Sequence, residues 1–228
     1  MQASHAGQAM AHARAEDRRE FIVQTYSHLL AAIAYFTLLE VALFRSGAAA
    51  KILQAISSVP WLAVLGAYMI VSWFASRAAA RAESLGVQYL ALIGFVSVKA
   101  VIFVPLLWAA NARADGVLQS AVAVTAIGFV GLTLIAVLSG GQFIGLGIFV
   151  RWGLFAALLL IVAGALFGFT LGPLFSVAMI ALAGGAVLSD TAKILHRYPR
   201  NRYVSAALEL FASIALMLWY VLRFLNRR

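Results

Sequence analysis

Long apolar runs, separated by short charged or Gly/Pro-containing breaks, dominate the chain. Seven runs are long enough for helices: Phe21–Phe44, Pro60–Ala75, Gly86–Ala110, Val117–Leu138, Phe143–Phe167, Pro173–Leu195 and Tyr203–Leu225. Most are close to the ~20 residues that an α-helix needs to cross a hydrocarbon core, whereas barrel strands would be ~10 residues long and alternating. The pattern predicts an all-α integral membrane bundle of seven transmembrane helices over residues 21–226, preceded by a polar N-terminal tail over residues 1–20.

Composition supports a lipid-embedded chain. Of the 228 residues, 64% are hydrophobic and only 11% are charged, whereas soluble domains carry roughly 25% charged residues. The net charge of +9 comes from basic clusters between the apolar runs, a pattern typical of contact with a bilayer rather than with nucleic acid. The chain has no cysteine, which excludes disulfides and thiolate sites. Residues 1–20 contain no apolar stretch of the kind found in signal peptides, so we expect the first span to direct insertion.

The basic residues also predict an orientation. Short loops make consecutive helices antiparallel, and nine Lys and Arg residues then fall on the face of the N-terminus against six on the opposite face. Because cytoplasmic loops are enriched in Lys and Arg, we expect a cytoplasmic N-terminus and an exported C-terminus.

An ionisable side chain inside an apolar run is costly and marks a candidate functional site, and five such residues stand out: Glu40, Lys99, Arg151, Asp190 and Glu209. Arg151 lies near the start of its helix, from which a long side chain reaches the interface. Lys99 lies in mid-helix, and we expect it to face the bundle interior and to pair with a carboxylate, with Glu40 the candidate partner. For Glu40, one turn from the end of its helix, an interfacial role is the alternative.

Asp190 and Glu209 form the most informative pair. They lie at equal distances from the Pro199–Arg200 turn between the last two helices. In an antiparallel hairpin this places both at one depth, ~10 Å from the loop side at 1.5 Å per residue. Two carboxylates in a low-dielectric site cannot both ionise cheaply, so we expect one proton or one cation to bridge them. The alternative is that each separately caps a helix end or pairs with Lys193 or an arginine.

Two segments carry a resemblance to a known family, Leu188-Ser-Asp-Thr-Ala-Lys-Ile-Leu195 and Ala207-Leu-Glu-Leu-Phe-Ala-Ser-Ile214. Weaker similarity occurs at Thr25-Tyr26 and at Gly140-Gly-Gln-Phe-Ile-Gly-Leu-Gly147. Over about residues 20–226 the chain resembles the Bax inhibitor family, the transmembrane Bax inhibitor motif proteins, including its bacterial branches.

The resemblance implies a seven-helix fold with the seventh helix central and an acidic pair that acts as a proton-sensitive latch. Asp190 matches the first acid, and Glu209 matches the second position, where the pattern usually has Asp. The partner arginine maps to Arg81 or Arg77, with Arg81 preferred. Asp190 and Glu209 are also the expected Ca²⁺ ligands. Lys99 departs from the pattern, because a fixed cation in the bundle would weaken Ca²⁺ entry unless an acid neutralised it.

The function expected from this resemblance is a pH-sensitive calcium leak or cation channel, gated by the coupled acidic pair and located in a bacterial plasma membrane. The alternative is a non-conducting modulator of a membrane-anchored protease or stress-response partner, with residues 1–20 as the contact. An enzyme is not expected, because HExxH and GxSxG motifs are absent from the sequence. Apart from Ca²⁺ as the transported or bound ion, no cofactor is expected.

Overall fold

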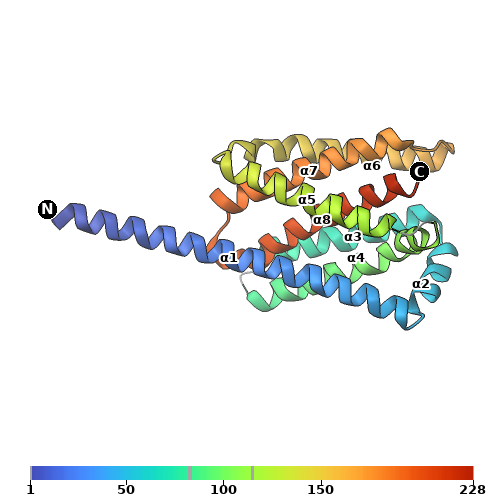
Figure 1. Ribbon diagram of the computed structural model, residues 1–228, viewed down its shortest axis with the longest axis horizontal. Helices are drawn as coiled ribbons and strands as arrows, with labels where there is room; N and C mark the ends of the chain where they lie inside the picture. The colour runs from blue at the N-terminus through green and yellow to red at the C-terminus, as the bar shows by residue number, and fades with distance from the viewer. Residues whose placement is uncertain (1, 82–83, 114–115, 228) are drawn as a thin grey trace.

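The computed structural model describes residues 2–81, 84–113 and 116–227 and is almost entirely helical (Figure 1). The described residues contain no strand, which confirms the all-α prediction. The helices are α1 (Gln2–Arg45), α2 (Ala48–Ser57), α3 (Trp61–Arg81), α4 (Leu85–Arg113), α5 (Val117–Leu138), α6 (Leu146–Phe167), α7 (Pro173–His196) and α8 (Tyr203–Leu225), with 3₁₀ turns η1 (Gln142–Gly145) and η2 (Arg200–Arg202).

Six segments of the described chain are long and apolar enough to cross a membrane. They begin at Glu16, Leu85, Val117, Gln142, Pro173 and Tyr203. A further candidate combines α2 with Leu62–Val71 of α3, bent by 115° at their junction. At 1.5 Å per residue, a 10-residue helix such as α2 covers only about 15 Å, half of a hydrocarbon core. The count of seven spans therefore stays a prediction.

The start of the chain differs from the sequence-based expectation. The predicted polar tail is helical and continuous with the first span in α1, because residues 2–20 are rich in Ala, Gln, Glu and Arg, which favour helix. Its N-terminal part extends beyond the rest of the bundle (Figure 1). The short helix α2, between Gly47 and Pro60, was not predicted. By contrast, α5 and α8 have the predicted bounds.

The helices run back and forth between two ends of the bundle (Figure 1). The end from which α1 projects, called here the N-terminal end, also holds the α5–α6 and α7–α8 connections. The opposite end, called here the C-terminal end, holds α2, the α6–α7 connection and the C-terminus. This arrangement places the α7–α8 turn and its flanking carboxylates at the N-terminal end.

Among the described helices, α8 contributes the largest share of buried residues to the main core. It packs against α1, α3, α4, α5 and α7. Aromatic rings fasten it to its neighbours, with Phe211 beside Phe36 and Phe95, and Trp219 beside Phe103. An ionisable residue on α8, such as Glu209, is therefore held within the bundle rather than on its rim.

Candidate functional site

The α7–α8 hairpin brings Asp190 and Glu209 into one interface at the N-terminal end. The Asp190 side chain is only 13% exposed, and both of its carboxylate oxygens have partners. Oδ1 lies 2.9 Å from the Lys193 ammonium, and Oδ2 accepts a hydrogen bond of 2.7 Å from the Ser213 hydroxyl on α8. The Asp190 carboxylate therefore joins the two helices and is satisfied within them.

Glu209 lies on the α8 side of the same interface. It interacts electrostatically with Asp190 and Lys193 and is hydrogen-bonded to the Tyr198 hydroxyl in the connecting turn. Burial raises the pKa of the Tyr198 phenol, and the nearby Glu209 and Asp190 charges raise it further. The phenol therefore stays protonated at neutral pH and donates to the Glu209 carboxylate.

Within the described part of the chain, Lys193, one helical turn beyond Asp190 on α7, forms a salt bridge with the Asp190 carboxylate. This was the alternative partner considered from the sequence. Arg77, at the end of α3, is exposed, and the side chain of Arg81 lies outside the described residues. The latch role of these two arginines stays a prediction. With Asp190, Glu209 and Lys193 all ionised, the cluster carries one net negative charge.

The glycine-rich segment before α6 packs directly on this part of α7. A Cβ atom at Gly147 would lie 2.6 Å from the Ser189 Oγ atom and 3.4 Å from the Lys193 Nζ atom. At Gly141, φ is 90° and a Cβ would lie 2.8 Å from the His196 ring. Only glycine permits this approach, so the segment singled out from residues 140–147 covers the side of α7 that carries Lys193.

An arginine of the predicted tail anchors the end of α7. The Arg18 guanidinium donates hydrogen bonds to the carbonyl groups of Ile194, Leu195 and Tyr198, at 2.6, 2.7 and 3.1 Å. The Ile194 and Leu195 carbonyls belong to the last turn of α7, and the Tyr198 carbonyl follows it. The last four carbonyl groups of a helix lack intrahelical donors, and a cation is favoured beside them. From the sequence, Arg18 counts only among the nine basic residues on the face of the N-terminus, because an arginine in the N-terminal tail carries no signal of a partner 176 residues away.

The same turn is held from α4. The buried Gln88 amide donates to the Asn201 carbonyl at 3.0 Å and accepts a hydrogen bond from the Ser205 hydroxyl at 3.1 Å. Together with Arg18, this side chain holds the turn that carries Tyr198.

A group of hydroxyls lies in the core beside the acidic pair. Tyr26 of α1 faces Thr133 of α5 and Thr191, the residue after Asp190 on α7. All three hydroxyl oxygens are buried without a hydrogen bond of regular geometry. Tyr26, which belongs to the weaker family-like segment Thr25-Tyr26, therefore lies against α7 at Thr191, next to Asp190 in the sequence.

The predicted Lys99–Glu40 ion pair is wrong. Lys99 is buried, 6% exposed, as expected, but its ammonium lies over the Tyr68 ring at 4.5 Å from the centroid. Glu40 is 7% exposed, and neither of its oxygens has a hydrogen-bond partner within the described part of the chain.

The register of α1 against α4 explains this error. Phe36 packs against Phe103 and Phe44 packs against Trp108. Glu40 lies one turn from each of these phenylalanines, so it is level with the part of α4 between Phe103 and Trp108. Lys99 lies one turn before Phe103. Lys99 itself turns toward α3.

No group of three or more His, Asp or Glu side chains converges over the residues described by the structure. The oxygen atoms of the acidic pair, with the Ser213 and Tyr198 hydroxyls, are the polar groups gathered at this interface. Asp190 and Glu209 as Ca²⁺ ligands stay a prediction.

Comparison with known protein families gives a match over most of the chain. The profile of the family described as "Inhibitor of apoptosis-promoting Bax1" matches residues 18–228. The match spans nearly the whole chain, from the arginine that anchors α7 to the C-terminus. No curated protein and no solved structure gives a significant match.

Proposed function

Because the chain belongs to the Bax inhibitor family, we propose that this multi-pass membrane protein is a pH-sensitive cation leak with Ca²⁺ as the conducted ion. The observation that supports the proposal is the partly buried Asp190–Glu209 interface between α7 and α8. Buried carboxylates that interact across two helices make the helix contact depend on protonation.

The chemistry of this interface suggests how protonation acts. In the described form, Lys193 and Ser213 hold the Asp190 carboxylate, while Tyr198 holds Glu209. When both acids are ionised, they repel each other across the α7–α8 contact, and Lys193 compensates one charge only. Protonation of one acid removes this repulsion and favours the closely packed hairpin. Deprotonation favours separation of the helices or entry of a cation.

The ligands at this interface suit Ca²⁺ as a weakly bound, conducted ion. Ca²⁺ takes 6–8 oxygen ligands, whereas the interface offers two carboxylates and the hydroxyls of Ser213 and Tyr198, with a lysine beside them. The positive charge of Lys193 weakens cation binding. Weak binding suits conduction, because an ion must leave the site as readily as it enters.

The proposed location is a bacterial plasma membrane with the N-terminus in the cytoplasm. The excess of Lys and Arg on the face of the N-terminus supports this orientation. In this orientation the α7–α8 turn and the acidic pair lie toward the cytoplasm, so cytoplasmic pH would control the leak.

The second candidate function is modulation of a membrane-anchored protease. The observation that favours it is the N-terminal part of α1, which extends beyond the bundle and is free to contact another protein (Figure 1). Deletion of residues 2–15 tests this contact and keeps Arg18, the anchor of α7. A leak should conduct normally after this deletion, whereas a modulator acting through the helix should lose its effect.

The leak is tested by Ca²⁺ flux into proteoliposomes between about pH 5 and pH 8, the range in which perturbed carboxyl groups titrate. Wild type should show a pH-dependent flux, and Asp190→Asn should flatten the response while remaining folded, because the amide still hydrogen-bonds to Ser213. Glu16→Gln, which neutralises an exposed acid, is the matched control and should behave like wild type. An unchanged pH profile for Asp190→Asn would remove the gating role of the pair and favour the protease modulator.

A further inference from the structure

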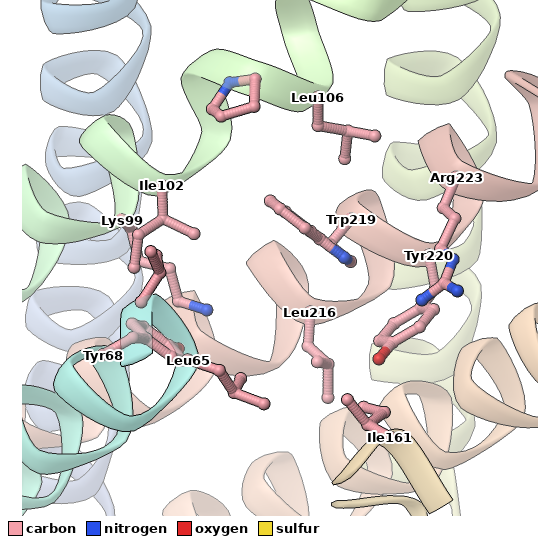
Figure 2. A pocket seen from close by; sticks show the side chains of 12 residues that line it. Leu65, Tyr68, Lys99, Ile102, Leu106, Ile161, Leu216, Trp219, Tyr220 and Arg223 are labelled. Atoms are coloured by element: carbon pink, nitrogen blue, oxygen red, sulfur yellow. The ribbon is translucent and has the colours of Figure 1, made fainter. Parts of the chain in front are cut away.

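A cavity of about 470 Å³ lies between α3, α4, α6 and α8 (Figure 2). Its volume lies in the roughly 300–1,000 Å³ range of small-molecule pockets. Pro105 interrupts the hydrogen-bond ladder of α4 at its wall. Most of the lining is apolar, including Leu65, Ile161 and Leu216. The cavity is separate from the acidic site, because neither Asp190 nor Glu209 lines it.

The charges that line this cavity are both positive. Lys99 of α4 and Arg223 of α8 contribute them, and the described lining contains no carboxylate. In Figure 2 the two side chains approach from opposite walls, with Trp219 between them. An apolar cavity with two cations favours an anionic guest.

Lys99 lacks the counter-charge that a buried ammonium needs. Its side chain is almost fully buried at the middle of α4, with the Tyr68 and Phe95 rings at 4.5 and 5.7 Å. Ring faces attract a cation but leave its charge uncompensated. A buried charge is normally paired, and among the described residues no salt bridge involves Lys99.

Arg223 is half-buried two residues before the end of α8, closer to the membrane face than Lys99. Its guanidinium lies over the rings of Phe175 and Tyr220, at 5.8 and 5.9 Å from their centroids. Arg223 also hydrogen-bonds to the Tyr220 hydroxyl. Because a guanidinium has five N–H donors, others serve a carboxylate or phosphate group.

The walls of the cavity pack on different partners. Helix α3 packs against α2, α4 and α8, whereas α6 packs against α7 and η1. In a bilayer, acyl chains surround a membrane-spanning bundle and therefore lie beside its outer helices, α3 and α6 among them. A ligand with a hydrocarbon tail is thus present at high local concentration on this side.

We propose that this cavity binds an amphipathic anion, a molecule with a carboxylate or phosphate head group and a hydrocarbon tail, which enters from the bilayer between α3 and α6. The head group supplies the missing counter-charge of Lys99, with Arg223 as the second cation. The tail lies along Leu216 and Ile161. A free inorganic anion would leave the apolar walls uncovered, and a neutral lipid would leave Lys99 unpaired.

The test measures equilibrium binding of radiolabelled oleate to the full-length protein in phosphatidylcholine nanodiscs, at a pH where the carboxylate is ionised. Wild type should bind saturably with one site, and Lys99→Gln should weaken binding about 10-fold, the usual effect of losing one charged hydrogen bond. Lys51→Gln removes an exposed lysine of α2 and should bind like wild type. Neutral monoolein should compete about 10-fold less well than oleate.

Three further arms locate the site and identify the head group. A dibrominated fatty acid should quench the fluorescence of Trp219, and Trp219→Phe should remove that part of the quenching. Ile161→Trp, which fills the cavity without changing charge, should also abolish binding. Stronger competition by oleate or by lysophosphatidate distinguishes a carboxylate from a phosphate head group. Equal binding by Lys99→Gln and wild type, an equal loss in Lys51→Gln, or equal competition by monoolein would overturn the proposal.

Discussion

Buried charges have partners at the acidic interface of Asp190 and Glu209 but no salt bridge at the basic cavity lined by Lys99 and Arg223, among the described residues. At the interface, Asp190 is compensated by Lys193 and Ser213, and Glu209 by Tyr198. At the cavity, Lys99 is surrounded by rings and apolar side chains. The first arrangement has its partners within the protein, and we propose it as the proton-sensitive contact. In the second, no salt bridge involves Lys99 among the described residues, and we propose it as a site for an anionic ligand.

Helix packing accounts for the difference. Asp190 and Glu209 lie on consecutive helices, and glycines allow the start of α6 to press against α7 beside them. Around Lys99, α3 and α6 pack on different partners and leave a cavity between them. Close packing leaves room only for the protein's own partners, whereas a gap admits another molecule.

The largest expected effect comes from loosening the packing at the acidic end. Gly147→Leu places side-chain atoms where Ser189 and Lys193 already lie, and should reduce the free energy of unfolding by about 2–3 kcal/mol. Gly131→Leu on α5 is the matched control, because a Cβ there meets nothing within 4 Å. Unfolding in mixed detergent micelles measures both variants. An equal loss in both would show that the α6–α7 contact is not specially tight.

An intermediate effect should separate the two lysines. Lys193→Met removes the cation beside Asp190, so the repulsion between the two carboxylates is no longer compensated. We expect the midpoint of the Ca²⁺ flux profile to rise by about one pH unit, a modest shift because Lys193 is 32% exposed and partly screened. Lys99→Met, which is remote from the acids, should leave the midpoint in place. A shift of the same size in Lys99→Met would mean that the two regions are coupled.

The smallest effect concerns stability at the cavity. Lys99→Met replaces a buried charge that has no carboxylate partner, and should raise the free energy of unfolding of delipidated protein by about 1 kcal/mol. Added oleate should stabilise wild type but not the variant, which reduces this difference. Thermal unfolding in neutral detergent measures both. Destabilisation by Lys99→Met would indicate that Lys99 has a structural partner within the bundle.

Much of the fold and part of the site could be predicted from the sequence, since both depend on local patterns. Apolar runs predicted α5 and α8 with their observed bounds. The joint position of Asp190 and Glu209 followed from one turn between adjacent helices, because residues equidistant from a hairpin turn share a depth. The family-like segments around these two acids agree with the family match over residues 18–228.

Contacts between distant segments were decided by the tertiary structure. The sequence paired Lys99 with Glu40 because both are charged and lie in apolar runs, but the Phe36–Phe103 contact sets α1 and α4 in a register that keeps them apart. Arg18 anchors α7 through carbonyl groups, which every residue has and no sequence pattern marks. The apolar runs in the sequence indicate which segments form buried or lipid-facing helices. The position of a turn indicates which residues of two consecutive helices lie at the same depth. Rotation and sliding of non-consecutive helices depend on side-chain packing, which only the assembled bundle defines.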